Sequence, residues 1–99
     1  MILKTTTIKI PIYYMKLRII VEDVMSEPEF AAYVKINGDL ISVNLTKDAT
    51  PGIIAHEAVH ITNCIFDSRL MELSLTNDEP YAYLLGWVVD KIHNTLNKD

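Results

Sequence analysis

The chain has 99 residues and a mass of 11.3 kDa, enough for one hydrophobic core and too little for two domains. Nine Lys and Arg against thirteen Asp and Glu give a formal net charge of −4, so the chain lacks the basic excess typical of proteins that bind nucleic acids or acidic membrane surfaces. The single cysteine, Cys64, excludes an internal disulfide and any metal site built from several cysteines.

The first half of the chain, residues 1–49, has the patterns of β-strands. Apolar side chains alternate with Tyr, Lys and Arg over residues 13–21, which is the two-residue period of a strand with one buried face. The following residues 22–29 are acidic and contain Pro28, so we expect a loop or at most one helical turn there.

Two further strands are predicted on either side of an Asn-Gly pair. Residues 30–36 carry apolar side chains on one face, and residues 40–45 have the composition of a partner strand. Asn37 and Gly38 are typical of a type I′ hairpin turn, in which both central residues take a positive φ. We therefore expect a hairpin here and about three strands in all.

The second half of the chain has the patterns of helices. Thr50 can cap a helix with its hydroxyl and Pro51 suits the first helical position, so a helix is predicted over residues 51–67. Its apolar residues occupy more than one face, which predicts burial on most sides. A second helix is predicted over residues 78–94, with Pro80 in its first turn. The predicted fold class is α+β, a single domain with a small sheet packed on two helices.

The first predicted helix contains the sequence His56-Glu57-Ala58-Val59-His60. Four residues advance a helix by about 400° and about 6 Å, so both imidazoles lie on one face and can reach one zinc ion. Glu57 stands about 100° round the helix, where its carboxylate can act as general base for a zinc-bound water without being a ligand. The motif predicts a hydrolytic zinc site. The alternative is a pair of partly buried histidines hydrogen-bonded to the sheet, with Glu57 at a solvated edge.

A catalytic zinc ion takes three protein ligands, so a third must come from elsewhere in the chain. Asp67 lies about 10 Å beyond His60 along the helix, too far for a ligand bond, and His93 is near the far end of the second helix. Glu79 and Asp78 stand at the start of the second helix, from which a side chain can point back at the motif helix. We predict Glu79 as the ligand and Asp78 as the helix cap, with Asp78 as the alternative ligand.

These residues resemble the gluzincin metallopeptidases, in which a Glu on the helix after the motif helix is the third zinc ligand. The closer likeness is to short, single-domain metallopeptidase-like proteins of phages and prophages, which have counterparts of residues 77–87, and it spans about residues 40–93. The resemblance implies a zincin-like fold, with an antiparallel sheet laid on the helix pair. It also implies zinc-dependent hydrolysis of peptide bonds, with His56, His60 and Glu79 as ligands.

The chain departs from the larger gluzincins in two respects. Those proteins often carry an Asp four residues after the ligand Glu, where this chain has Tyr83, and they have a substrate-side domain for which this chain has no room. Tyr83 is one helical turn after Glu79, so its hydroxyl can serve as a donor at the site; the alternative is a Tyr packed between helix and sheet. We expect residues 40–45 to form the sheet edge along which a substrate peptide pairs.

Three other residues have simple structural interpretations. Cys64 is expected to be a small core residue rather than a fourth ligand. His93 is expected at the surface near the end of the second helix, where it interacts with the helix dipole. Gly86 is expected to allow close approach of the motif helix.

The leading hypothesis is a small zinc metallopeptidase acting on a peptide or protein substrate, with Glu57 as its general base. A second hypothesis is a zincin-fold protein with little or no turnover that serves as a zinc-stabilised interaction or assembly module, and a third is a metal-free globular module. Neither a nucleic acid nor a membrane is expected as a partner. Because no signal peptide or membrane-spanning run is evident, we expect a cytoplasmic protein, or a phage-encoded one released by lysis.

Overall fold

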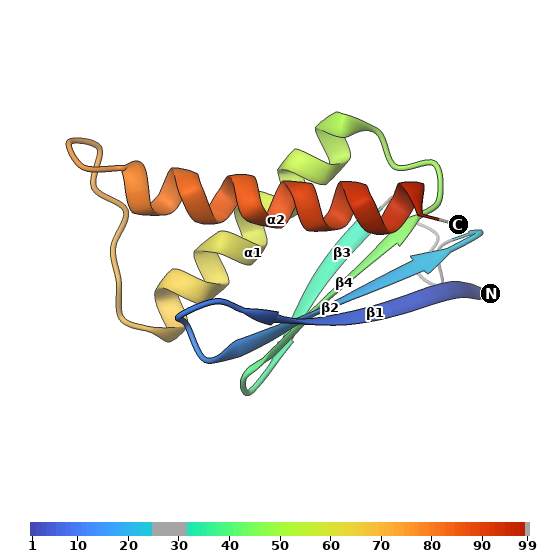
Figure 1. Ribbon diagram of the computed structural model, residues 1–99, viewed down its shortest axis with the longest axis horizontal. Helices are drawn as coiled ribbons and strands as arrows, with labels where there is room; N and C mark the ends of the chain where they lie inside the picture. Colours follow the sequence, from blue (N-terminus) through green and yellow to red (C-terminus); the bar gives the residue numbers. More distant parts are fainter. Residues whose placement is uncertain (25–31, 99) are drawn as a thin grey trace.

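The computed structural model describes residues 1–24 and 32–98, in which four strands are followed by two helices (Figure 1). The strands are β1 (Ile2–Ile10), β2 (Met15–Glu22), β3 (Ala32–Asn37) and β4 (Leu40–Thr46), and the helices are α1 (Pro51–Ser68) and α2 (Glu79–Asn97). Both helices lie on the same side of the sheet (Figure 1). The predicted α+β class is confirmed. The predicted strand start at residue 30 and most of the predicted acidic loop lie outside the described residues.

The sheet differs from the prediction in its strand number and direction. It has four strands in the order β1-β2-β4-β3, whereas about three antiparallel strands were expected. The two outer pairs are antiparallel, but β2 and β4 pair in parallel. The β3–β4 hairpin contacts the rest of the sheet through β4, so β4 lies at the centre of the sheet and β3 at an edge. This order decides which strand is accessible to a partner.

Strand β1 was not predicted, because its helix-facing side is apolar only in its second half, at Ile8 and Ile10. Lys4, Thr6 and Ile8 alternate on that side, so the hydrophobic period is weak. The Lys4 ammonium instead donates to the backbone carbonyls of Thr95 and Lys98 near the end of α2. A run of Ile and Thr residues, both favoured in strands, is the remaining sequence signal for β1.

The turn between β3 and β4 is shifted by one residue from its predicted place. Asn37 is the last residue of β3 and pairs with Leu40, so the two central residues are Gly38 and Asp39. Gly38 has a φ of 61°, whereas neither Asn37 nor Asp39 takes a positive φ. A type I′ turn is therefore excluded, since it needs a positive φ at both central positions. Glycine at the first central position is what a type II′ turn requires.

The hydrophobic core lies between the helix-facing side of the sheet and the two helices. Its largest fully buried apolar side chains come from β2, β4, α1 and α2: Leu17, Ile19, Val21, Ile41, Val43, Leu45, Ile61, Ile65, Val88 and Ile92. Helix α1 nevertheless keeps one exposed face, which carries His56, Val59 and His60, so the predicted burial on most sides is wrong. Neither helix of the described chain combines the length and apolar character needed to cross a membrane.

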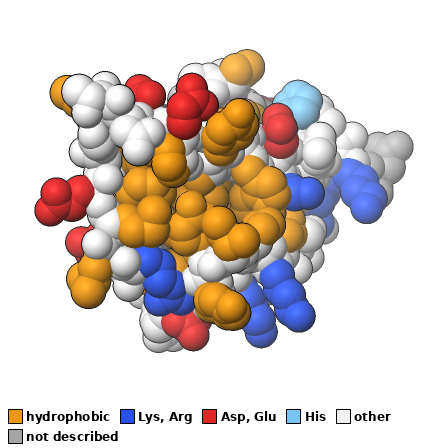
Figure 2. Space-filling view, turned by 60° about the vertical axis from the view of Figure 1, so that its left-hand side comes forward, with side chains coloured by type: hydrophobic (Ala, Val, Ile, Leu, Met, Phe, Trp, Pro, Cys, Tyr) orange, Lys and Arg blue, Asp and Glu red, His pale blue; other side chains and the backbone are white. Residues whose placement is uncertain are grey.

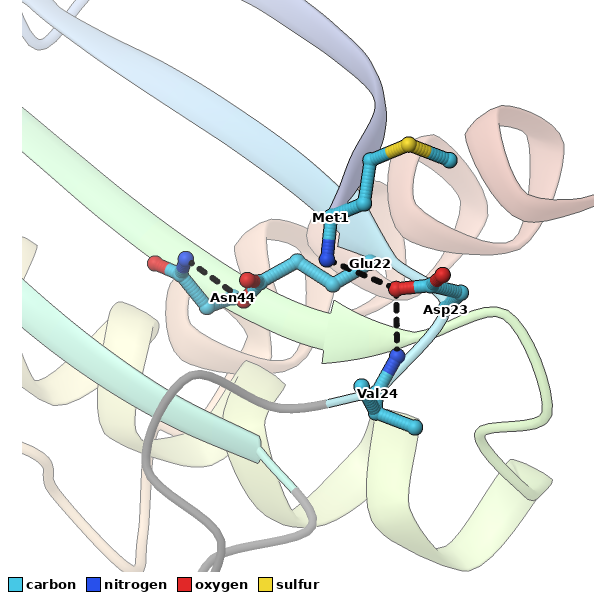
Figure 3. Close-up of polar contacts among 5 residues, drawn as sticks. All are labelled: Met1, Glu22, Asp23, Val24 and Asn44. Carbon is cyan, nitrogen blue, oxygen red and sulfur yellow. Dashed lines mark hydrogen bonds and ion pairs between the residues drawn. The ribbon is translucent and has the colours of Figure 1, made fainter.

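Polar contacts hold the end of the sheet where β1 starts and β2 finishes (Figure 3). The amino group of Met1 forms an ion pair with the Asp23 carboxylate at 2.8 Å, and the same oxygen accepts the backbone N–H of Val24. The buried Glu22 carboxylate accepts a hydrogen bond from the Asn44 side chain at 3.1 Å. These contacts tie β1 to β2, and β2 to β4.

Candidate functional site

Helix α1 begins as the sequence predicts. The Thr50 hydroxyl accepts a hydrogen bond from the Ile53 N–H at 3.2 Å, and Pro51 is the first helical residue. This start places His56 and His60 one turn apart on the exposed face of the helix. Their Nε2 atoms are 3.1 Å apart, and their rings meet edge to face with centroids 4.8 Å apart. The prediction that the two imidazoles share one face is confirmed.

The distance between the two ring nitrogens fits a shared zinc ion. Two ligands at about 2.0–2.1 Å from a tetrahedral zinc ion are about 3.3 Å apart. The observed 3.1 Å is close to that value and also suits a hydrogen bond between two neutral rings. The separation of the two Nε2 atoms is therefore compatible both with a shared metal ion and with a hydrogen bond between the rings.

Glu57 lies beside the histidine pair and is buried. The residue is only 6% exposed. The carboxylate Oε2 lies 3.8 Å from the His56 Nε2, which is longer than a direct hydrogen bond. The alternative of a Glu57 at a solvated edge is therefore wrong. The Glu57 carboxylate is thus buried and lies within ion-pair distance of the His56 ring.

A shallow hollow of about 460 Å³ runs between this face of α1 and the edge strand β3. Ala32, Tyr33 and Val34 of β3 form one wall. The other wall comes from α1 and consists of His56, Glu57, His60, Asn63 and Cys64. Since β4 pairs with a strand on each side, the expectation that residues 40–45 form the edge beside the site is wrong, and β3 takes that place.

The structure does not bring Glu79 or Asp78 to the histidine pair. Among the residues that the structure describes, no three or more His, Cys, Asp or Glu side chains are grouped so that they could hold a metal ion. Glu79 is the first residue of α2 and is exposed. Asp78 occupies the cap position, as predicted, but its side chain makes no capping hydrogen bond.

The register of α2 explains this arrangement. The Tyr81 hydroxyl donates to the Asn63 side-chain oxygen at 2.6 Å, and the Tyr81 ring packs edge to face on Phe66. Tyr81 therefore faces α1. Residues two positions away lie about 200° round a helix, so both Glu79 and Tyr83 are on the far side of α2.

Tyr83 accordingly lies away from the hollow beside the histidines. It is 76% exposed and lines a separate surface with Pro11, Ile12 and Trp87. Neither the expected hydroxyl donor nor the alternative of a Tyr between helix and sheet describes this position. The Tyr81–Asn63 contact beside the site was not predicted. Asn63 follows His60 by three residues, a helical spacing that could have placed it on the same face.

Three further residues, Cys64, His93 and Gly86, can be compared with their predicted places. Cys64 is half-buried against the core, as expected, and burial followed by the nearby Asp67 charge raises the pKa of its thiol. His93 is exposed on α2 and contacts the side chain of Asn97 one turn further on. Gly86 is also exposed, and an added Cβ would meet nothing within 4 Å, so the expected close approach of α1 there is wrong.

Comparison of the chain with protein-family models, curated proteins and solved structures finds no match. The gluzincin resemblance accordingly stays an interpretation of the motif residues.

Proposed function

We propose that the protein is a small zinc-dependent metallopeptidase of gluzincin type. The observation that carries this proposal is the pair of His Nε2 atoms 3.1 Å apart on an exposed helix face, with a buried carboxylate 3.8 Å from one of them. Two imidazoles, with the carboxylate of Glu79 as the proposed third ligand, are a donor set that suits zinc.

The proposed chemistry divides between the metal and the chain. Zinc, when bound, lowers the pKa of a coordinated water and polarises the carbonyl of the peptide to be cleaved. Glu57 accepts the proton of the attacking water at its carboxylate and passes it to the nitrogen of the leaving amine. The burial of Glu57 keeps its carboxylate in one position beside the histidines, so that it need not be ordered during the reaction.

Glu79 is the proposed third ligand, and Asp78 is the alternative. For Glu79 to reach the histidine pair, the first turn of α2 must rotate from the position described above. At the start of that turn the Asp78 side chain makes no capping hydrogen bond, and Tyr81 is the residue that ties the turn to α1, through Asn63. We propose that zinc binding supplies the free energy for this rotation.

The proposed substrate is an extended peptide or protein segment. Strand β3 is an edge strand and forms one wall of the hollow that the histidines line. A peptide that pairs with β3 would pass directly in front of His56 and His60. The hollow is shallow and open, which favours an unfolded chain over a compact ligand.

The test is a digest of a broad peptide library by the zinc-reconstituted protein and its Glu57→Gln variant. We expect Glu57→Gln to keep one zinc ion per chain and to lose hydrolysis, because the amide cannot accept the proton. Glu72→Gln, which removes an exposed carboxylate between the helices, is the matched control and should cleave normally. Full activity in Glu57→Gln, or no zinc bound after reconstitution, would refute the proposal.

A second candidate function, a zinc-stabilised assembly module, is favoured by one surface of the molecule. Figure 2 shows hydrophobic side chains gathered in one broad area, with Lys and Arg side chains along its lower border. An apolar surface lies between the β1–β2 turn and α2, and is lined by Pro11, Ile12, Tyr13, Pro80, Tyr83, Leu84 and Trp87. Peptide cleavage that tracks zinc content and disappears in Glu57→Gln would exclude this alternative.

A further inference from the structure

The side of the sheet away from the helices carries a cluster of cations. Lys9 of β1 is directly opposite Lys16 of β2, and Arg18 follows on the same face of β2, about 7 Å along the strand. Lys35 of β3 and Arg18 are both opposite Ser42 of the intervening strand, so their backbones are about 10 Å apart. Four of the nine Lys and Arg residues of an acidic chain therefore lie on one face.

These cations have no carboxylate partner among the described residues. Asp39, in the β3–β4 turn, lines the same hollow as Lys16 and Arg18, but its ion pair, at 3.7 Å, is with Arg69. Glu22, at the far end of the same face, is buried and accepts from Asn44. Like charges directly opposite one another in adjacent strands destabilise a sheet. The Lys9–Lys16 pair therefore has a cost that no contact within the described chain offsets.

Three of the cations line a hollow of about 790 Å³ that is separate from the histidine site. Lys9, Lys16 and Arg18 line it together with one carboxylate, Asp39. The β1–β2 turn supplies an apolar wall that includes Ile12 and Tyr14. These two side chains are 82% and 88% exposed. Both residues have a positive φ, 61° and 55°, a conformation that costs free energy for any residue with a side chain and most for a β-branched one.

Arg69, at the end of α1, holds this wall in place. Its guanidinium donates to the backbone carbonyls of Tyr13 at 2.7 Å and Tyr14 at 3.0 Å. Its ion pair with Asp39 joins the β1–β2 turn to the β3–β4 turn across the same end of the sheet. The hollow is thus a formed surface with a fixed rim.

We propose that this cationic hollow docks an acidic, partly apolar segment of a partner protein. Carboxylates of such a segment would offset the repulsion between Lys9 and Lys16, and its apolar side chains would cover Ile12 and Tyr14. A long polyanion such as a nucleic acid is disfavoured by the net charge of −4, and a flat bilayer does not fit a concave surface. The proposal does not depend on zinc or on peptidase activity, because the histidine site is on the other side of the sheet.

The test measures fluorescence anisotropy of a labelled peptide of Asp and Glu with interspersed Leu. We expect saturable binding that weakens as salt is raised, because screening shortens the range of the attraction. The double charge reversal Lys16→Glu with Arg18→Glu should weaken binding by about tenfold. The control Lys47→Glu alters the charge of an exposed residue that does not line the hollow, and should bind like the unaltered protein.

Further arms of the experiment distinguish other partners. Far-ultraviolet circular dichroism would show whether the double variant still folds. Lys9→Glu, a single change on the edge strand β1, should also weaken peptide binding and keeps the test valid if the double variant misfolds. Glu57→Gln should bind the peptide normally, which separates this proposal from the peptidase proposal. Equal binding by the charge-reversed variants and the unaltered protein would overturn the inference. So would tighter binding of a single-stranded DNA oligonucleotide or of anionic phospholipid vesicles than of the acidic peptide.

Discussion

The starts of the two helices differ, and the difference bears directly on the proposed zinc site. Helix α1 starts with a hydroxyl cap and a proline, and its two histidines are brought together by the helical period alone. Helix α2 starts without a side-chain cap, and the direction of Glu79 depends on how α2 is rotated against α1. Ligands within one helix are positioned locally, whereas a ligand on a second helix requires the correct packing of both.

The largest expected effect separates the two kinds of ligand. His60→Ala should weaken zinc binding by more than about a hundredfold, since an imidazole already positioned for the metal is lost. Glu79→Gln should weaken it less, by about tenfold, because part of its bond energy is used to rotate the first turn of α2. Competition with a chromogenic chelator measures both. Unchanged affinity in His60→Ala would show that the histidine pair is not a metal site.

The helix caps offer a second comparison, in stability rather than metal binding. Thr50→Ala removes the hydroxyl that accepts the Ile53 N–H and should lower the free energy of unfolding by about 1 kcal/mol. Asp78→Ala should change it by much less, because the Asp78 side chain makes no capping bond. Urea denaturation followed by circular dichroism gives both values. A larger loss in Asp78→Ala would mean that α2 is capped in solution after all.

Tyr81→Phe tests whether α2 must rotate to complete the site. Loss of the hydroxyl removes the hydrogen bond to Asn63 and should destabilise the metal-free protein by about 0.5–1.5 kcal/mol. If that bond holds Glu79 away from the histidines, the same variant should bind zinc more tightly. Thermal melting measures the change in stability, and zinc titration of the same sample measures the change in zinc affinity. Weaker zinc binding would indicate that Tyr81 supports the site instead of restraining α2.

The smallest expected effect is the pH dependence of the Met1–Asp23 ion pair (Figure 3). The hydrogen bond from the Met1 ammonium lowers the pKa of Asp23 below its usual 3.8, and the same contact raises the pKa of the ammonium above 8.0. The stabilisation of the folded protein by the Asp23 carboxylate is therefore present above pH 3.8 and is lost as pH falls through the lowered pKa. The ammonium contribution is present below pH 8.0 and is lost as pH rises through the raised value.

A comparison of melting temperatures between the unaltered protein and Asp23→Asn measures this contribution. The difference should be small, because both groups are exposed, and should be greatest between the two pH limits. It should vanish at both ends of the range. A difference in melting temperature that stays constant across pH would show that the effect of Asp23→Asn does not come from the ion pair.

The sequence by itself determined those features that depend on neighbours along the chain. The start of α1 at Pro51, its cap at Thr50 and the shared face of His56 and His60 follow from helix chemistry and the 3.6-residue period. Strands β2 and β3 were predicted for a similar reason, because alternation of apolar residues requires only a buried face. Strand β4 was predicted as the hairpin partner of β3.

Only the tertiary structure decided the features that depend on distant pairing. Strand β1 forms by backbone hydrogen bonding to β2, and its own residues have no strong apolar period that would predict a strand. The order of the strands placed β3, and not β4, beside the histidines. Packing of Tyr81 against α1 turned Glu79 and Tyr83 outward. These outcomes depend on contacts between residues far apart in the chain, and local sequence patterns do not predict which of those contacts form.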